Sequence, residues 1–122
     1  DSYNSNLDSA RESISNLSQY KTKNRRIAVI GDMLELGEKE ILYHKKLGKF
    51  IANKKIDAVF GFGDLINHTI ETLKSNNINA FAFKNREKLS IKLKKFLSKG
   101  DVILFKGSRG MYLEKIINKV FK

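Results

Sequence analysis

The sequence contains no cysteine, so the chain can form neither a disulfide framework nor a thiolate metal site. That absence fits a reducing compartment, and we expect a cytoplasmic protein. No apolar stretch approaches the roughly 20 residues of a membrane span, and no signal-peptide pattern opens the chain. We therefore expect no membrane insertion. Proline is absent too, which removes the usual marks of a domain boundary, and we expect residues 1–122 to form one domain.

Several kinds of catalytic motif are also absent from the sequence. The sequence holds no Ser-His-Asp constellation, no metal-spaced cluster of His and Asp, and no glycine-rich loop for the phosphates of ATP. A length of 122 residues is enough for a single core but short for a complete multi-substrate enzyme. We expect a fragment that binds ligands without catalysing a reaction alone, and that contains no metal ligands.

The charge is strongly one-sided, with 24 lysines and arginines against 13 aspartates and glutamates and a formal net charge of +11. Such a balance is typical of nucleic-acid-binding proteins, because clustered cations displace counterions from phosphate backbones. The lysines are spread over every expected helix, however, and no aromatic platform alternates with them. The distribution favours solvated helix faces and no nucleic-acid partner, with a phosphate-seeking surface as the alternative.

Short apolar runs alternate along the chain with segments that carry apolar residues at helical spacing. The run 27–30, rich in β-branched residues, is typical of a strand that helices cover on both faces. Strands and helices in alternation predict right-handed crossovers. We expect an α/β, Rossmann-like three-layer domain with a mainly parallel sheet. Strands are predicted at 26–31, 58–62, 80–83 and 101–106, and helices at 7–20 (capped by Asn6), 38–54, 64–75, 86–98 and 111–121.

The first expected strand ends at Gly31, where a side chain would obstruct the turn, and Asp32 follows directly. Open parallel sheets bind ligands at the edge formed by the carboxyl ends of their strands. Glycines also occur at the end of the second expected strand, at Gly61 and Gly63, and directly after the fourth, at Gly107. Three strand ends are therefore expected at one rim. Asp32 is therefore a candidate binding residue. The alternative is that it caps a helix or pairs with a nearby arginine.

Two further features near this rim are weaker signals. Gly61-Phe-Gly63 resembles the start of a dinucleotide fingerprint, but Ile66 stands where the third glycine would be. A tight turn between a strand and a helix is the better interpretation. His44, in the second expected helix, is more typical of a hydrogen-bonded helix histidine than of a ligand or a base.

The sharpest local signal is the loop Lys106-Gly-Ser-Arg-Gly110. Its lysine, two glycines, hydroxyl and arginine lead into an expected helix N-terminus, which is itself favourable for anions. The guanidinium of Arg109 can bind a carboxylate or phosphate through two hydrogen bonds. We predict an anion-binding loop, although its spacing differs from that of an ATP phosphate loop. The alternative is a charged turn in which Arg109 pairs with Asp32 or Glu35.

Three motifs, taken together and in chain order, resemble one family. Asp1-Ser-Tyr-Asn-Ser-Asn6 resembles the motif Asp-Ser-Tyr-Asn-Ala-Asn-Pro. Gly31-Asp-Met-Leu-Glu-Leu-Gly37 with His44 resembles Gly-Asp-Met-x-Glu-Leu-Gly followed by His, and Lys106-Gly-Ser-Arg109 resembles Lys-Gly-Ser-Arg. These are motifs of the Mur ligases, specifically of the MurF type. The resemblance spans the whole chain, and it identifies the C-terminal domain of a three-domain ligase.

The resemblance implies an ATP-dependent ligase that adds D-Ala-D-Ala to UDP-N-acetylmuramoyl-tripeptide in peptidoglycan precursor synthesis. In this family a central domain binds most of the ATP and Mg²⁺, ATP phosphorylates the tripeptide carboxylate, and the dipeptide amine attacks the acyl phosphate. The C-terminal domain closes the site. By resemblance, the nucleotide-binding residues are Asp1, Tyr3, Asn4 and Asn6, the substrate-binding residues are Asp32, Lys106, Ser108 and Arg109, and the supporting residues are Gly31, His44 and Gly107.

One departure from the family pattern is that Leu7 stands in place of the first motif's proline. At the first position of a helix that proline only pre-sets φ, so its loss is expected to loosen the turn without removing a ligand. Without the resemblance, the residues favour a second function: a free-standing Rossmann-like nucleotide-binding or regulatory module.

Overall fold

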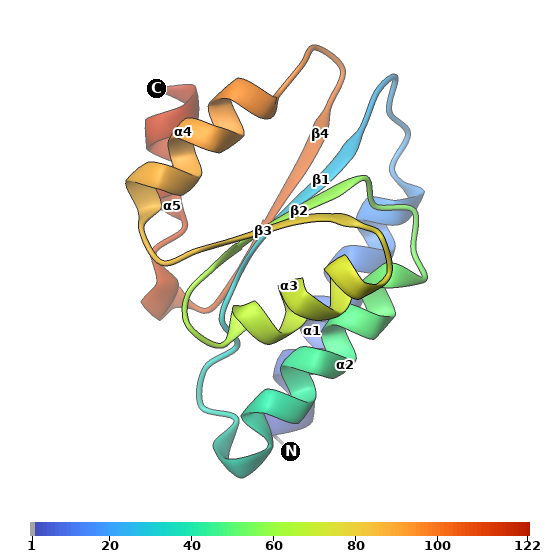
Figure 1. The fold of residues 1–122 in the computed structure, drawn as a ribbon, viewed down its shortest axis with the longest axis vertical. Coiled ribbons are helices and arrows are strands. Elements are labelled where there is room, and N and C mark those ends of the chain that lie inside the picture. Colours follow the sequence, from blue (N-terminus) through green and yellow to red (C-terminus); the bar gives the residue numbers. More distant parts are fainter. Residues whose placement is uncertain (1) are drawn as a thin grey trace.

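A parallel sheet forms the centre of the fold (Figure 1). The structure is a computed structural model that describes residues 2–122, with the side chains of residues 6–122. Within this range the sheet has four strands in the spatial order β3-β2-β1-β4, and each neighbouring pair is parallel. The carboxyl ends therefore meet at one edge, as predicted. The strands are β1 (Arg26–Gly31), β2 (Ala58–Phe62), β3 (Asn79–Phe83) and β4 (Val102–Lys106).

Helices cover both faces of the sheet and complete three layers (Figure 1). One face carries α1 (Ser2–Gln19), α2 (Glu40–Ala52) and α3 (Ile66–Ser75), and the other carries α4 (Arg86–Phe96) and α5 (Glu114–Phe121). Side chains of β1 alternate between the layers, with Ala28 and Ile30 in the first core and Ile27 and Val29 in the second. The predicted Rossmann-like fold is confirmed. None of the helices within residues 2–122 is long and apolar enough to cross a membrane.

The middle of the sheet is its most buried part. All residues of β2 are buried, and the ring of Phe60 lies 5.0 Å from that of Phe81 and 5.3 Å from that of Phe96, between centroids. Burial of such a ring contributes on the order of 2–3 kcal/mol, and aromatic pairing adds about 1 kcal/mol. All residues of the edge strand β4 are only half-buried. The central strands β1 and β2 thus give the rim a rigid base.

The amino end of the sheet is fastened by an ion pair. Arg25 Nη2 lies 2.8 Å from Oδ2 of Asp101, a side chain that is 2% exposed. The carboxylate also accepts hydrogen bonds from the backbone N–H groups of Ser98, at 2.8 Å, and Arg25, at 3.1 Å. Burial acts to raise the pKa of Asp101, but these hydrogen bonds and the Arg25 charge outweigh it and hold the pKa below its ordinary value. The pair fixes β4 beside β1 at the end opposite the rim.

The strand predictions agree with the structure to within one residue, but several helix starts differ. α1 begins at Ser2 rather than Leu7, so Asn6 lies inside the helix and does not cap it. α2 and α3 each begin two residues later than predicted, at Glu40 and Ile66, and a 3₁₀ turn, η1 (Gly37–Lys39), precedes α2. The first difference matters for the site, because it extends α1 along the rim.

The prediction is also wrong for the start of the last helix. A 3₁₀ turn, η2 (Arg109–Met111), follows β4, and α5 begins only at Glu114. Between them Tyr112 is left-handed, with φ 50°. This arrangement buries both Met111 and Leu113. Met111 then packs so tightly on Gly31 that a Cβ added there would lie 2.9 Å from Met111 Cγ.

Candidate functional site

Three segments far apart in the sequence meet at the carboxyl rim of the sheet. They are the start of α1, the loop after β1 and the loop after β4, and they surround a pocket of about 60 Å³. A volume of this size has room for a few waters or one small polar group. The structure therefore brings together these predicted site residues as lining of one pocket: Asn6, Gly31, Asp32, Lys106, Gly107 and Ser108.

The side chain of Asp32 caps helix α3. It is 6% exposed, its Oδ1 accepts a hydrogen bond from Ile66 N–H at 2.7 Å, and its Oδ2 accepts one from Asp64 N–H at 3.0 Å. Leu65, at the N-cap position itself, makes no such bond. A carboxylate is favourable there because the helix dipole and charge-assisted hydrogen bonds both stabilise it. These contacts agree with the capping interpretation, and direct substrate contact by Asp32 stays a prediction.

Gly63 makes room for that carboxylate. Its φ is +127°, and an added Cβ would lie 2.4 Å from both Cγ and Oδ1 of Asp32. A side chain at this position would therefore be strained and would also displace the cap. Gly63 thus permits a tight turn around Asp32, in agreement with the turn interpretation, whereas Gly61 lies within β2 and makes room for Ile70 of α3.

His44 is fully buried in α2 and holds the backbone of the loop after β1. Met33 N–H donates to its Nε2 at 3.0 Å, and its Nδ1 lies 2.7 Å from the Glu40 carbonyl. Because an N–H can only donate and a carbonyl can only accept, the proton is assigned to Nδ1 and the ring is neutral. Burial lowers the pKa of His44, and the Glu40 carbonyl and the Asp32 charge offset only part of that effect. The neutral imidazole thus positions Met33, next to Asp32.

Lys106 and Ser108 contact the other two segments of the rim. Lys106 Nζ lies 2.7 Å from Ser9 Oγ on α1. The hydroxyl of Ser108 lies 3.5 Å from the Asp32 carbonyl and 3.4 Å from Leu34 N, at the long limit of hydrogen bonding. Within residues 6–122, Lys106 forms no ion pair with an acidic side chain. Its ammonium charge therefore stands beside the pocket without a compensating carboxylate.

Arg109 is exposed at the start of η2. Within the described range 6–122 it forms no ion pair with Asp32, Glu35 or any other acidic side chain, so the pairing that the charged-turn alternative requires is not found. The physical reason given for anion binding also needs a correction. The loop leads into a 3₁₀ turn rather than an α-helix, so the dipole of α5 begins too far along the chain to assist. Anion binding by this loop stays a prediction, and it depends on the side chains of the loop without help from a helix dipole.

Only one predicted nucleotide-binding residue has a described side chain. Asn6 Nδ2 donates to the Leu34 carbonyl at 3.0 Å and so links α1 to the loop after β1. Asp1 lies outside the described residues, and Tyr3 and Asn4 precede the described side chains. Their proposed roles stay predictions.

Ser9 is a rim residue that the sequence interpretation missed. It lies three residues after Asn6, so both side chains fall on the same side of α1, and both line the pocket. The signal was readable only by extending the first helix back through the polar segment 2–6. Within the described residues, no three His, Cys, Asp or Glu side chains gather into a metal site.

The fold and this rim define a Rossmann-like α/β domain. At the carboxyl rim of its sheet, Lys106 has no carboxylate partner among residues 6–122 and Arg109 is exposed. Residues 1–109 match the family model described as "Mur ligase, glutamate ligase domain". The chain belongs to this Mur ligase family. The family predicted from the three motifs is confirmed.

Curated relatives match the chain from end to end. It is 34% identical to the UDP-N-acetylmuramoyl-tripeptide--D-alanyl-D-alanine ligase of Bacillus subtilis, with all of the chain and 27% of the relative covered. It is 38% identical to the ligase of the same name from Buchnera aphidicola subsp. Acyrthosiphon pisum, with all of the chain and 26% of the relative covered. The chain therefore spans about a quarter of the length of these relatives.

Solved structures give the same relationship. The MurF ligase of Thermotoga maritima in complex with ADP superposes with a TM-score of 0.73 at 27% identity, over 93% of this chain and 25% of that one. MurF from Acinetobacter baumannii superposes with a TM-score of 0.83 at 23% identity, over the same shares of the two chains. The second likeness supports the fold alone.

Proposed function

We propose that residues 1–122 are the C-terminal domain of a ligase that uses ATP to join D-Ala-D-Ala to UDP-N-acetylmuramoyl-tripeptide. The observation that carries the proposal is the meeting of three family motifs at one pocket, through Asn6, Asp32 and Lys106 with Ser108. Relatives that bear this activity in their names are similar to the whole chain. The ADP complex of a structural neighbour supports an adenine nucleotide as co-substrate.

In this proposal the domain binds and orients anionic groups and contributes no catalytic residue. A peptide carboxylate and the phosphates of ATP are anions, and Lys106 and Arg109 offer cations at the rim. An ammonium attracts such groups as a point charge, whereas a guanidinium binds them in a fixed, two-bond geometry. Asp32 and His44 hold the neighbouring loop in place. When the domain closes over the rest of the ligase, water is excluded and the bound groups are held in register.

The nucleotide and Mg²⁺ are assigned mainly to the central domain of the ligase. The described residues offer no cluster of metal ligands, so this chain is proposed to approach ATP only through the first motif, at Asp1, Tyr3, Asn4 and Asn6. The partners are then the N-terminal and central domains of the same ligase. We also infer a cytoplasmic location, where ATP is available and a cysteine-free chain needs no oxidising environment.

A domain exchange tests this function. Residues 1–122 would replace the matching quarter of the Bacillus subtilis relative, and amide-bond formation would be measured with ATP, D-Ala-D-Ala and the UDP-tripeptide. We expect activity from the exchanged enzyme and none from the 122-residue chain or from the relative without its matching segment. A folded but inactive exchange would contradict the proposal. Micromolar ATP binding by the isolated chain in calorimetry would instead support a free-standing nucleotide-binding module.

A further inference from the structure

The positive charge is concentrated in one part of the molecule. Residues 84–122, which supply α4, β4 and α5, contain 12 lysines and arginines and 3 acidic residues, a net charge of +9. Residues 1–83 contain 12 and 10 of these residues, a net charge of +2. The helices of one layer, α4 and α5, contain 7 lysines and arginines and 2 acidic residues, whereas α1, α2 and α3 in the other layer contain 5 and 4, so the first layer is the more basic.

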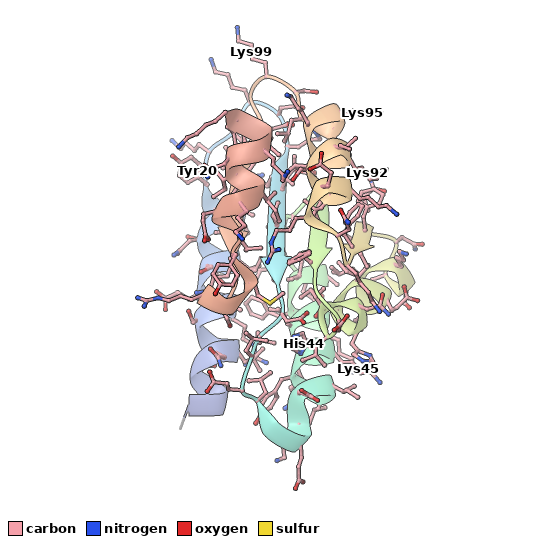
Figure 2. All side chains as sticks on the ribbon, turned by 90° about the vertical axis from the view of Figure 1, so that its left-hand side faces the viewer. Tyr20, His44, Lys45, Lys92, Lys95 and Lys99 are labelled. Carbon is pink, nitrogen blue, oxygen red and sulfur yellow. The ribbon has the colours of Figure 1, made fainter. Side chains whose placement is uncertain are left out.

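Four lysines follow one another along the exposed side of α4 and the turn after it. Lys88, Lys92, Lys95 and Lys99, the lysine stripe, are spaced by three or four residues, which places the helical ones on the same face. Figure 2 shows Lys92 and Lys95 beside α4 and Lys99 at the tip of the turn above it, all well away from Lys45 of α2. Ile91 lies among them and is 49% exposed. The stripe is therefore a basic surface with an apolar residue inside it.

Acidic side chains of residues 6–122 do not pair with the lysine stripe, although Lys92 Nζ lies 4.4 Å from the centroid of the Phe81 ring. Two of the three acidic residues in 84–122 are engaged elsewhere, since Glu87 pairs with Lys119 and Asp101 with Arg25. Like charges three and four residues apart on a helix repel one another. A negatively charged surface laid against α4 would relieve that repulsion.

We propose that the lysine stripe docks the chain onto the surface of an anionic lipid bilayer. Lysines beside an exposed aliphatic residue suit a layer of lipid head groups, which attracts diffuse positive charge and accepts apolar side chains at its boundary. The chemistry that nucleic acids require is not on the stripe. It carries no arginine for two-bond contacts and no aromatic ring for stacking on bases. The nearby Arg86 already donates to the Met111 carbonyl at 2.9 Å.

Two variants with the same net charge test the proposal. The first replaces three lysines of the stripe (Lys92→Gln, Lys95→Gln, Lys99→Gln), and the second replaces three exposed lysines of α2 (Lys45→Gln, Lys46→Gln, Lys49→Gln). Binding to vesicles of phosphatidylglycerol and phosphatidylcholine would be measured by co-sedimentation at low and physiological salt. A lysine near an anionic bilayer contributes about a fivefold factor in binding. We expect roughly a hundredfold loss in the first variant and a change within about threefold in the second.

The same measurements can overturn the proposal. Equal losses in both variants would show attraction by net charge without a docking face. No wild-type binding to the anionic vesicles at low salt would also reject it. Tighter binding of the wild type to a DNA duplex, lost in the first variant alone, would assign the stripe to nucleic acid instead. Melting temperatures within a few degrees of the wild type are expected for both variants, because all six side chains are exposed.

Discussion

Two loops reach the same rim, but their polar groups have very different surroundings. In the loop after β1, both carboxylate oxygens of the buried Asp32 and both ring nitrogens of the buried His44 have hydrogen-bond partners at 3.0 Å or less. In the loop after β4, Ser108 has only contacts at the long limit of hydrogen bonding, and Arg109 is exposed. The comparison shows that the polar side chains of the first loop are engaged within the fold, whereas Arg109 of the second is exposed and forms no ion pair with the side chains of residues 6–122.

The largest effect is expected for Asp32→Ala, measured as the free energy of unfolding in urea. The substitution leaves the N–H groups of Asp64 and Ile66 without their acceptor and removes the cap of α3. We expect a loss of about 3 kcal/mol, since each buried unsatisfied donor costs about 1–3 kcal/mol. Asp32→Asn keeps one acceptor oxygen and is expected to lose less. A loss below about 0.5 kcal/mol in Asp32→Ala would erase the distinction between the two loops.

The next effect concerns activity instead of stability. Arg109→Ala in the full-length ligase is expected to lower kcat/KM for its substrates by about tenfold to a hundredfold, because a charge-assisted contact contributes roughly 1.5–3 kcal/mol. Arg109→Lys keeps the charge but loses the planar fork, so it should be nearly as damaging. The melting temperature of both variants should match the wild type, because the side chain is exposed. Wild-type kcat/KM for D-Ala-D-Ala and for the UDP-tripeptide in Arg109→Ala would reduce this loop to a structural turn.

The smallest effect is a pH dependence that belongs to the first loop alone. Because burial lowers the pKa of His44, the unfolded chain takes up a proton on this residue at a higher pH than the folded chain does. Stability from the neutral ring is thus complete above the ordinary histidine pKa of about 6.5 and is lost as the pH falls. Because only one proton is involved, the free energy of unfolding can change by at most about 1.4 kcal/mol per pH unit from this residue.

A comparison of unfolding free energies between pH 7 and pH 5 measures this slope. His44→Gln has no titrating ring and should give a flatter profile, while Arg109→Ala should follow the wild type, because a guanidinium does not titrate in this range. Equal slopes in the wild type and His44→Gln would exclude His44 as the source of the pH dependence.

The strands and their common rim could be predicted because their signals are local. An apolar run such as 27–30, followed by Gly31, identifies a buried strand and its end without any knowledge of the partners. The alternation of strands with helices then predicts crossover connections and therefore parallel strands. The approach of Asp32 and Lys106 to one pocket follows from that topology, and it is the part of the site that the sequence predicted best.

The contacts of the site could not be predicted, because they join distant parts of the chain. Rules for helix caps search the few residues before a helix, whereas the cap of α3 comes from Asp32, 34 residues before Ile66. Likewise, the polar segment before Leu7 has the composition of a turn, yet it is helical, and Asn6 bonds to Leu34 instead of capping. At the last helix, burial of both Met111 and Leu113 overrides the helical pattern that the sequence shows.

The strand order also has a consequence for the way in which the chain folds. β1 pairs with β2 and β2 with β3 between strands that follow one another in sequence, whereas the pairing of β1 with β4 places Arg26 opposite Val102, 76 residues away. Closing so long a loop carries the greatest entropic cost in the sheet, so we expect this pairing to form last. The two rim loops therefore meet only when β4 docks. A ligand that binds both loops would stabilise the docked position of β4, and we expect it to slow the detachment of β4 during unfolding.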